Sequence, residues 1–286
     1  MKRVVFWTVA LVLAAGSVWA DTISGGTLTG FPAGFAATTG ASGVQGSPFW
    51  NDYSMDGNQM NVGYFLTASG GLTSEPNRTP TQYLSDGTAS AANAPLSFNF
   101  VRNTASLQIV LLGAFSSLNA TTAGNLGTAV GIYDTSNPLS KTVLFASGTI
   151  PTSSGVAGSP SAFASPYASY GFYATVCFGP SASQCRTYYT QSALDQSAAT
   201  GGAILEPAAH QHFAVFAANG LAANQESYYI GIEDGWGTTG SERLGDYQDI
   251  IFAISAITAV PEPGTFVFMG LGLVGVALAG RRLRKK

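Results

Sequence analysis

The sequence is short of charge: Asp, Glu, Lys and Arg make up 9% of its 286 residues. Basic residues are scarcest in the central part of the chain. Residues 21–259 contain five Lys or Arg and fourteen Asp or Glu, which gives a formal net charge of −9. Proteins that bind nucleic acid need clustered basic residues to neutralise phosphates. We therefore expect no nucleic-acid partner, and an acidic body that attracts cations.

Cysteine and histidine are nearly absent, with two residues of each type. Cys177 and Cys185 are eight positions apart, and in an oxidising compartment the simplest interpretation is one disulfide, worth about 2–3 kcal/mol. On a strand, His210 and His212 would point to the same face. Without a third ligand nearby, we expect both at polar surface positions. The sequence contains no serine nucleophile elbow, phosphate-binding glycine loop or zinc-protease motif.

A long amphipathic helix is also missing from the central part, which is rich in Gly, Ala, Ser, Thr and aromatic residues. Short segments with alternating or continuous apolar residues predict strands instead. The predicted strands cover residues 59–68, 96–101, 107–115, 128–133, 142–150, 170–178, 186–189, 212–217, 227–233 and 248–257. The run at 107–115 is expected to be buried on both faces. These features predict an all-β fold over 21–259, an antiparallel β-sandwich with jelly-roll-like or Greek-key connections and about ten strands.

Both ends differ from this body. Residues 1–20 combine a basic start, an apolar run and small residues before position 21, as in a secretory signal peptide. We expect the Sec translocon to export the chain and signal peptidase to cut between Ala20 and Asp21. The apolar run is short for a permanent membrane anchor.

The last segment, 260–286, has three parts in a fixed order. Val260, Pro261, Glu262 and Pro263 come first, an apolar stretch follows at 265–280, and a basic cluster closes the chain. The apolar stretch predicts a single transmembrane helix whose basic end stays on the cytoplasmic side. The body would then lie outside the inner membrane.

This C-terminal segment resembles the PEP-CTERM sorting signal. The resemblance implies recognition by an exosortase, an inner-membrane transpeptidase, with cleavage at or near Pro261-Glu262-Pro263. It also implies a bacterium that builds exopolysaccharide or biofilm matrix, and a chain anchored transiently in the inner membrane before it reaches the cell surface or the matrix. A weaker resemblance covers 212–252, which is similar to a C-terminal module of such secreted proteins that has no assigned enzyme activity. This chain has Gln248 at the position where that module usually has Asn.

Four carboxylates lie at the ends of two predicted strands: Glu233 and Asp234 close one strand, while Asp246 and Asp249 open the next. Like charges held together need a cation or exposure to solvent, and Ca²⁺ prefers oxygen ligands of this kind. A solvated acidic loop, or carboxylates that cap backbone N–H groups, would explain the same pattern. Two of the acids could also serve a glycoside hydrolase. Trp236, between the acids, is a possible glycan contact.

These patterns predict a non-enzymatic protein of the cell envelope or extracellular matrix, with a structural or polysaccharide-associated body. A Ca²⁺-dependent adhesion or carbohydrate-binding module is the first alternative. A secreted glycan hydrolase is the second. No cofactor other than Ca²⁺ is indicated.

Overall fold

The computed structural model describes part of the chain and divides it into two compact units, 1–256 and 257–286. The described residues are 21–30, 50, 62, 66, 80–85, 97–103, 106–114, 127–146, 161–177, 185–197, 202–203, 212–219, 226–234 and 247–256. All of them belong to the first unit. The predicted C-terminal helix at 265–280 lies outside them. Among the described residues, none forms a helix that is both long and apolar enough to cross a membrane.

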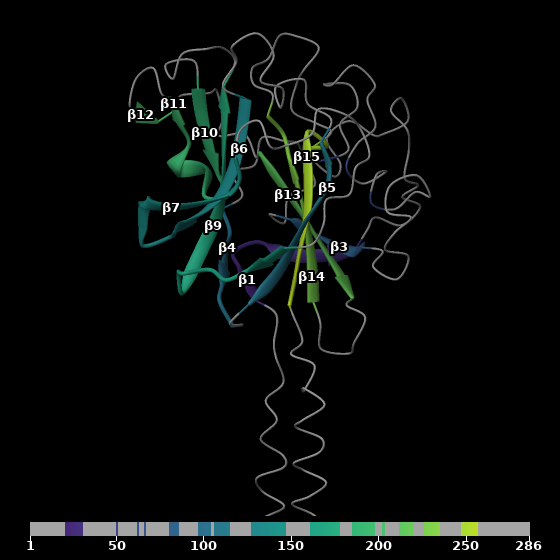
Figure 1. The fold of residues 1–286 in the computed structure, drawn as a ribbon. Coiled ribbons are helices and arrows are strands. Elements are labelled where there is room, and N and C mark those ends of the chain that lie inside the picture. The colour runs from purple at the N-terminus through teal and green to yellow at the C-terminus, as the bar shows by residue number, and fades with distance from the viewer. Residues whose placement is uncertain are drawn as a thin grey trace, which may run out of the picture. The chain divides into compact units, whose positions relative to one another are not determined.

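The described elements form two antiparallel sheets (Figure 1). The first sheet contains β1 (Thr22–Ser24), β4 (Asn99–Val101), β6 (Gly127–Asp134), β7 (Asn137–Phe145), β9 (Ser169–Cys177), β10 (Cys185–Tyr189), β11 (Gln196–Ser197) and β12 (Gly202–Ala203). The long strand β9 organises this sheet, since it pairs with β6 on one side and with β4 and β10 on the other.

The second sheet has the order β2-β3-β13-β14-β15-β5-β8. Its strands are β2 (Thr27–Gly30), β3 (Pro80–Ser85), β5 (Leu107–Ala114), β8 (Ser161–Phe163), β13 (Phe213–Asn219), β14 (Glu226–Ile232) and β15 (Ile250–Ala256). Three strands at its centre, β13, β14 and β15, are consecutive in sequence and pair in register over six or seven residues. They carry the acidic cluster described below.

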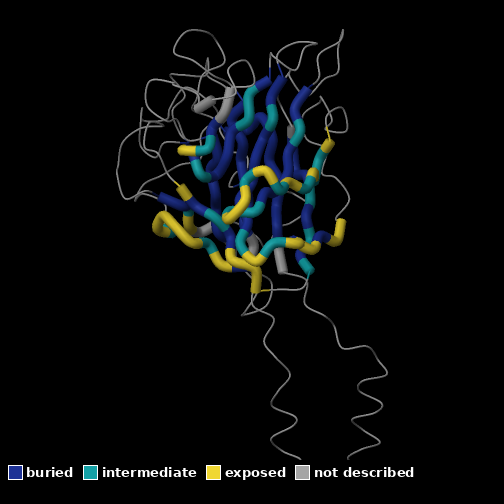
Figure 2. The backbone as a smooth tube through the Cα atoms, turned by 90° about the vertical axis from the view of Figure 1, so that its left-hand side faces the viewer, coloured by how far each residue is buried: buried dark blue, intermediate teal, exposed yellow. Residues whose placement is uncertain are grey.

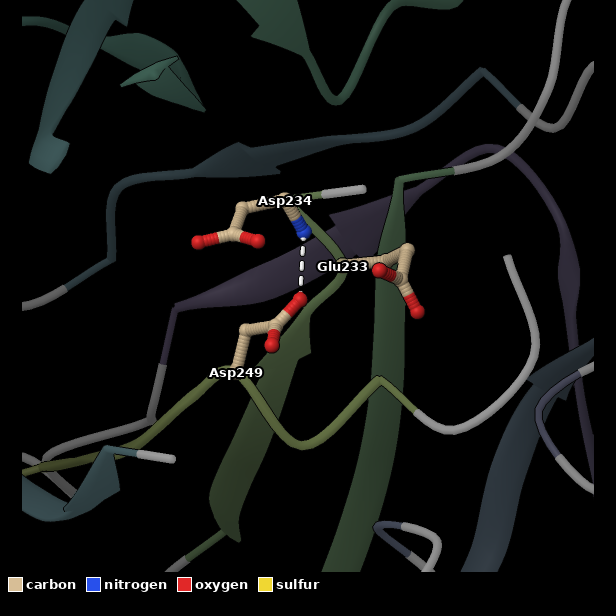
Figure 3. Close-up of side chains that lie close together, drawn as sticks. All are labelled: Glu233, Asp234 and Asp249. Atoms are coloured by element: carbon tan, nitrogen blue, oxygen red, sulfur yellow. Dashed lines mark hydrogen bonds between the residues drawn. The ribbon is translucent and has the colours of Figure 1, made fainter. Parts of the chain in front are cut away.

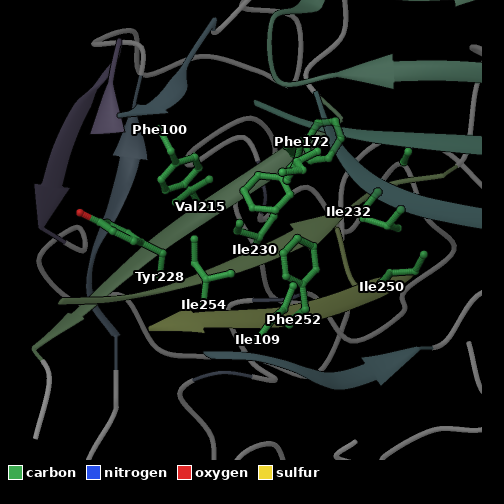
Figure 4. Close-up of a cluster of buried hydrophobic side chains, with 14 of the residues drawn as sticks. Phe100, Ile109, Phe172, Val215, Tyr228, Ile230, Ile232, Ile250, Phe252 and Ile254 are labelled. Carbon is green, nitrogen blue, oxygen red and sulfur yellow. The ribbon is translucent and has the colours of Figure 1, made fainter. Parts of the chain in front are cut away.

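The main hydrophobic core lies between the sheets, where alternate residues of both meet. Phe100 and Phe172 from the first sheet pack with Tyr228 and Phe252 from the second (Figure 4). The strand backbones are accordingly buried over most of their length, and exposure concentrates at turns and edges (Figure 2). The predicted all-β sandwich is confirmed.

The outer face of the second sheet is covered as well. Trp50, Val62, Leu66 and Tyr247 pack there against Phe216 and Tyr229. β5 therefore buries Leu107 and Ile109 in the main core and Leu112 on the outer side, as expected for a strand buried on both faces. Of the strand predicted at 59–68, only Val62 and Leu66 are described, and at these two residues the prediction is wrong, because their backbones are helical. Their spacing of four places both on one helical face, which outweighs the alternation seen in the sequence.

On the outer face of the first sheet, tyrosines and glycines alternate across β6 and β9. Tyr173 lies opposite Gly131, and Tyr133 lies opposite Gly171. A Cβ on Gly131 would lie 2.6 Å from the Tyr173 ring, and a Cβ on Gly171 would lie 2.5 Å from the Tyr133 ring. Each tyrosine ring thus occupies the space that a side chain on the opposite glycine would fill.

Most predicted strands are present, with shifted ends. The predicted strands 170–178 and 186–189 form the β9–β10 hairpin. β7 pairs with β6, and it starts at Asn137 rather than at the predicted 142. β8 lies in a part of the chain where the sequence predicts no strand. The same holds for β11 and β12, which follow a short 3-10 helix, η4 (Ser192–Leu194).

Candidate functional site

The acidic cluster is built by the pairing of β14 and β15. Ile232, the last residue of β14, lies opposite Ile250, the first residue of β15. Glu233 and Asp234 therefore continue past one strand end where Asp249 precedes the other. The predicted convergence of these acids at the mouth of a hairpin follows from antiparallel pairing. Asp246 lies outside the described residues.

The three carboxylates are both close together and buried. One oxygen from each lies within 4.8 Å of the others, and the exposed fractions are 2% for Glu233, 0% for Asp234 and 6% for Asp249. The backbone N–H of Asp234 donates a 2.7 Å hydrogen bond to Oδ2 of Asp249 (Figure 3). The cluster is thus part of the folded interior. The alternative of a solvated acidic loop does not describe these three side chains.

Burial dominates the electrostatics of the cluster. It raises the pKa of Asp249, while hydrogen bonds with the Glu233 side chain and with the backbone and side chain of Asp234 act in the opposite direction. Three ionised carboxylates at this spacing would repel one another strongly at low dielectric. The cluster therefore needs shared protons or a bound cation to remain buried. Carboxylates can adopt either state, because their oxygens can share protons and can also bind a cation such as Ca²⁺.

His212, the residue before β13, supports the cluster. The Glu233 backbone N–H donates to the His212 carbonyl at 3.0 Å, and His212 Nδ1 lies 2.9 Å from the Glu233 carbonyl oxygen. Because a carbonyl oxygen only accepts, Nδ1 carries the proton. The imidazole stacks on Tyr188 of the first sheet, with 3.5 Å between ring centroids. The predicted surface position for His212 is wrong, since it is buried. His210 lies outside the described residues.

Tyr247, two residues before Asp249, has a positive φ of 54°. This conformation is uncommon for a residue other than glycine, and it sets the direction in which the chain enters β15. The Tyr247 carbonyl oxygen would lie 2.5 Å from a Cβ on Gly231. Gly231 therefore allows the chain leading to Asp249 to lie directly against β14. The only local signal of this contact in the sequence is a glycine inside an apolar strand, which does not by itself predict it.

The other predicted site residues separate into two groups. Cys177 and Cys185 lie opposite each other in the β9–β10 hairpin and are joined by a disulfide. Asp21 is described and buried. The remainder, namely Ala20, Trp236, Val260, Pro261, Glu262 and Pro263, lie outside the described residues.

The burial of the three acids bears on what they can do. A glycoside hydrolase must bring two carboxyl groups to the bond of a sugar chain, but these acids are almost inaccessible to a polymer. A cation coordinated by oxygens, or a proton-sharing structural cluster, fits the burial better.

Comparison with known proteins identifies the C-terminal segment. Residues 259–285 match the family model of the PEP-CTERM protein-sorting motif. The chain therefore carries the sorting signal of an exported exosortase substrate. No curated protein and no solved structure matched the chain.

Proposed function

We propose that the chain is a non-enzymatic component of the cell envelope or extracellular matrix, with a body that acts structurally or associates with polysaccharide. The sorting motif at 259–285 is the observation that carries the proposal. Export through the Sec translocon and signal peptidase would precede sorting. Segment 265–280 would hold the chain transiently in the inner membrane until an exosortase acts.

The composition and the fold support this role. The acidic body contains a single lysine, Lys141, and its ammonium group lies 4.8 Å above the rings of both Tyr173 and Tyr189. The apolar residues of the two sheets pack in the main core between the sheets and in the cluster on the outer face of the second sheet. Such a body is a packed, acidic unit suited to a hydrated polysaccharide matrix.

Replacement of Pro261, Glu262 and Pro263 by alanine tests the sorting step in a bacterial host that contains an exosortase. We expect the variant to remain in the membrane fraction with its tail attached, while the parent chain is processed and leaves that fraction. Immunoblots of fractionated cells, with an epitope placed in the body, measure this. Processing and release of the variant at the parent rate would contradict the proposal.

Ca²⁺-dependent stabilisation is a second candidate, favoured by the three buried carboxylates within 4.8 Å of one another. On this hypothesis Ca²⁺ raises the melting temperature of the purified protein and EGTA reverses the rise. Replacement of Glu233 by Gln together with Asp234 and Asp249 by Asn removes the response. Asp134→Asn, at the β6–β7 turn, is the matched control. Melting that is independent of Ca²⁺ in the parent protein would leave proton sharing as the state of the cluster.

Association with polysaccharide has its own test. The parent protein and a Trp236→Ala variant are passed over immobilised exopolysaccharide from the producing cells. We expect the parent to be retained. If Trp236 is a glycan contact, the variant elutes earlier, whereas free passage of the parent would favour a purely structural body.

A further inference from the structure

Asp21 is the first described residue of the chain, and its side chain is held in the interior. It is 1% exposed. Its Oδ1 accepts a 2.8 Å hydrogen bond from the backbone N–H of Asn103. Its Oδ2 accepts a 2.8 Å hydrogen bond from the hydroxyl of Tyr170. The two partners are 82 and 149 positions away along the chain, so the carboxylate links three distant segments.

Tyr170, one of the two partners of Asp21, belongs to β9 and to the main core. Tyr170 is fully buried, stacks on Phe100 and lies edge-on to Phe163 and Phe172 in the main core. Burial, and then the charge of Asp21, raise the pKa of Tyr170 well above its usual value. The hydroxyl therefore stays protonated and available as a donor.

The strand after Asp21 is fixed to the same place. Thr22 lies opposite Val101 in the β1–β4 pair, and Asn103 Nδ2 donates to Thr22 Oγ1 at 3.3 Å. Chain ends usually fray unless something ties them down. A buried carboxylate is costly unless it is hydrogen-bonded. The two hydrogen bonds of the Asp21 carboxylate satisfy it in the interior, and they also tie down the chain directly before the three-residue strand β1.

We propose that Asp21 is the N-terminal residue of the exported protein and that its carboxylate anchors this new terminus to the sandwich. Signal peptidase would hydrolyse the Ala20–Asp21 peptide bond. The oxygen of water bonds to the Ala20 carbonyl carbon, the C–N bond breaks, and the Asp21 nitrogen leaves as an amine that takes up a proton. The released peptide keeps a carboxylate at Ala20. The position of the cut and the first tertiary contact of the folded body then fall on one residue.

This inference extends beyond the proposed function, because it does not depend on what the body binds. It depends on removal of the signal peptide between Ala20 and Asp21. A cut even one residue later would remove the anchor and leave Tyr170 with a buried hydroxyl facing the vacated position.

The first test maps the N-terminus of the protein recovered after export, by mass spectrometry of its N-terminal peptide. We expect the peptide to begin at Asp21. A peptide that begins elsewhere, or an uncut chain in the exported fraction, would overturn the proposal.

The second test measures melting temperatures of Asp21→Asn, Tyr170→Phe and the double variant. Asp134→Asn, the same chemical change at a turn, is the control. We expect Asp21→Asn to melt about 5 °C below the control. The double variant should melt within a degree or two of the less stable single variant, because both changes remove the same hydrogen bond between Tyr170 and Asp21. Additive losses, or an Asp21→Asn variant as stable as the control, would overturn the anchor. If Asp21→Asn does not fold, Tyr170→Phe alone decides, and its unchanged melting would overturn the anchor.

Discussion

At the scale of single residues, glycines shape the outer face of the first sheet. Gly131 and Gly171 stand opposite Tyr173 and Tyr133, and the two rings occupy the space that side chains at the glycines would fill. Tyr133 also donates a 2.9 Å hydrogen bond from its hydroxyl to Oε1 of Gln191. The small residue and the large one are therefore a single packing unit across two strands.

Gly131→Ala should destabilise the protein by about 1–3 kcal/mol, because the new methyl group overlaps the Tyr173 ring and the backbone of β7. Gly30→Ala is the matched control, since a Cβ there has nothing within 4 Å. Urea denaturation of the two variants measures the difference. Equal stability of both variants would show that the ring over Gly131 moves aside without cost.

Tyr189 gives a residue-scale prediction about alkaline pH. Burial, followed by the charges of Asp195 and Tyr173, raises its pKa to about 12, against about 10 in an unfolded chain. Above pH 10 the unfolded chain loses this proton first, so stability should fall as the pH rises from 10 to 12. Melting temperatures across this range, with tyrosinate absorbance, measure the effect. Tyr189→Phe should show a smaller fall over the same range, and an identical fall would assign the effect to other groups.

At the scale of elements, the β9–β10 hairpin is closed by the disulfide between Cys177 and Cys185. The two residues are direct cross-strand partners at the end of the pair where the connecting loop joins β9 to β10. The hairpin also carries Tyr188, which stacks on His212 beside the acidic cluster. The covalent link therefore lies in the same element that supports the site from the first sheet.

Removal of this disulfide should cost about 2–3 kcal/mol, because the loop that it closes in the unfolded chain is short. Urea denaturation with and without a reductant measures the loss. A variant with both cysteines replaced by serine should be less stable than the parent by the same amount and insensitive to the reductant. A parent protein with the same stability in both conditions would contradict the prediction.

Elements with a local pattern could be predicted, and elements defined by distant partners could not. The β9–β10 hairpin and the continuous apolar run of β5 were visible in the sequence, because neighbouring residues determine both. β1 has only three residues and owes its place to β4, more than seventy positions away. Val62 and Leu66 fit a strand pattern in isolation and become helical where they cover the second sheet.

The acidic cluster was predictable for a similar reason. The order Glu233, Asp234, then Asp249 around a hairpin implies that the acids converge, because antiparallel strands bring their flanking residues to one end. Their burial was not predictable, since it depends on His212, Tyr247 and the opposing sheet. The anchoring of Asp21 joins residues 149 positions apart, and no local pattern marks such a contact.

At the scale of the whole molecule, the distribution of lysine provides a test of processing at both ends. The full chain contains Lys2, Lys141, Lys285 and Lys286. Removal of the signal peptide takes away the first, and cleavage at the sorting motif takes away the last two. The processed chain should then carry amines only at the Asp21 nitrogen and at Lys141. Exhaustive labelling of the unfolded protein with an amine-reactive reagent, followed by peptide mapping, should find these two positions. A label on Lys285 or Lys286 in protein recovered from the cell surface would show that the tail is retained. A label on Lys2 would show the same for the signal peptide. In the folded protein Lys141 should react more slowly than the α-amine, because its ammonium group lies over two tyrosine rings that shield it. Burial acts in the opposite direction, since it lowers the pKa of Lys141. The lower pKa alone would favour the reactive neutral form, so slower labelling would indicate that steric shielding by the rings outweighs it. A Lys141 that labels as fast as the α-amine would show instead that the contact with the rings does not shield it.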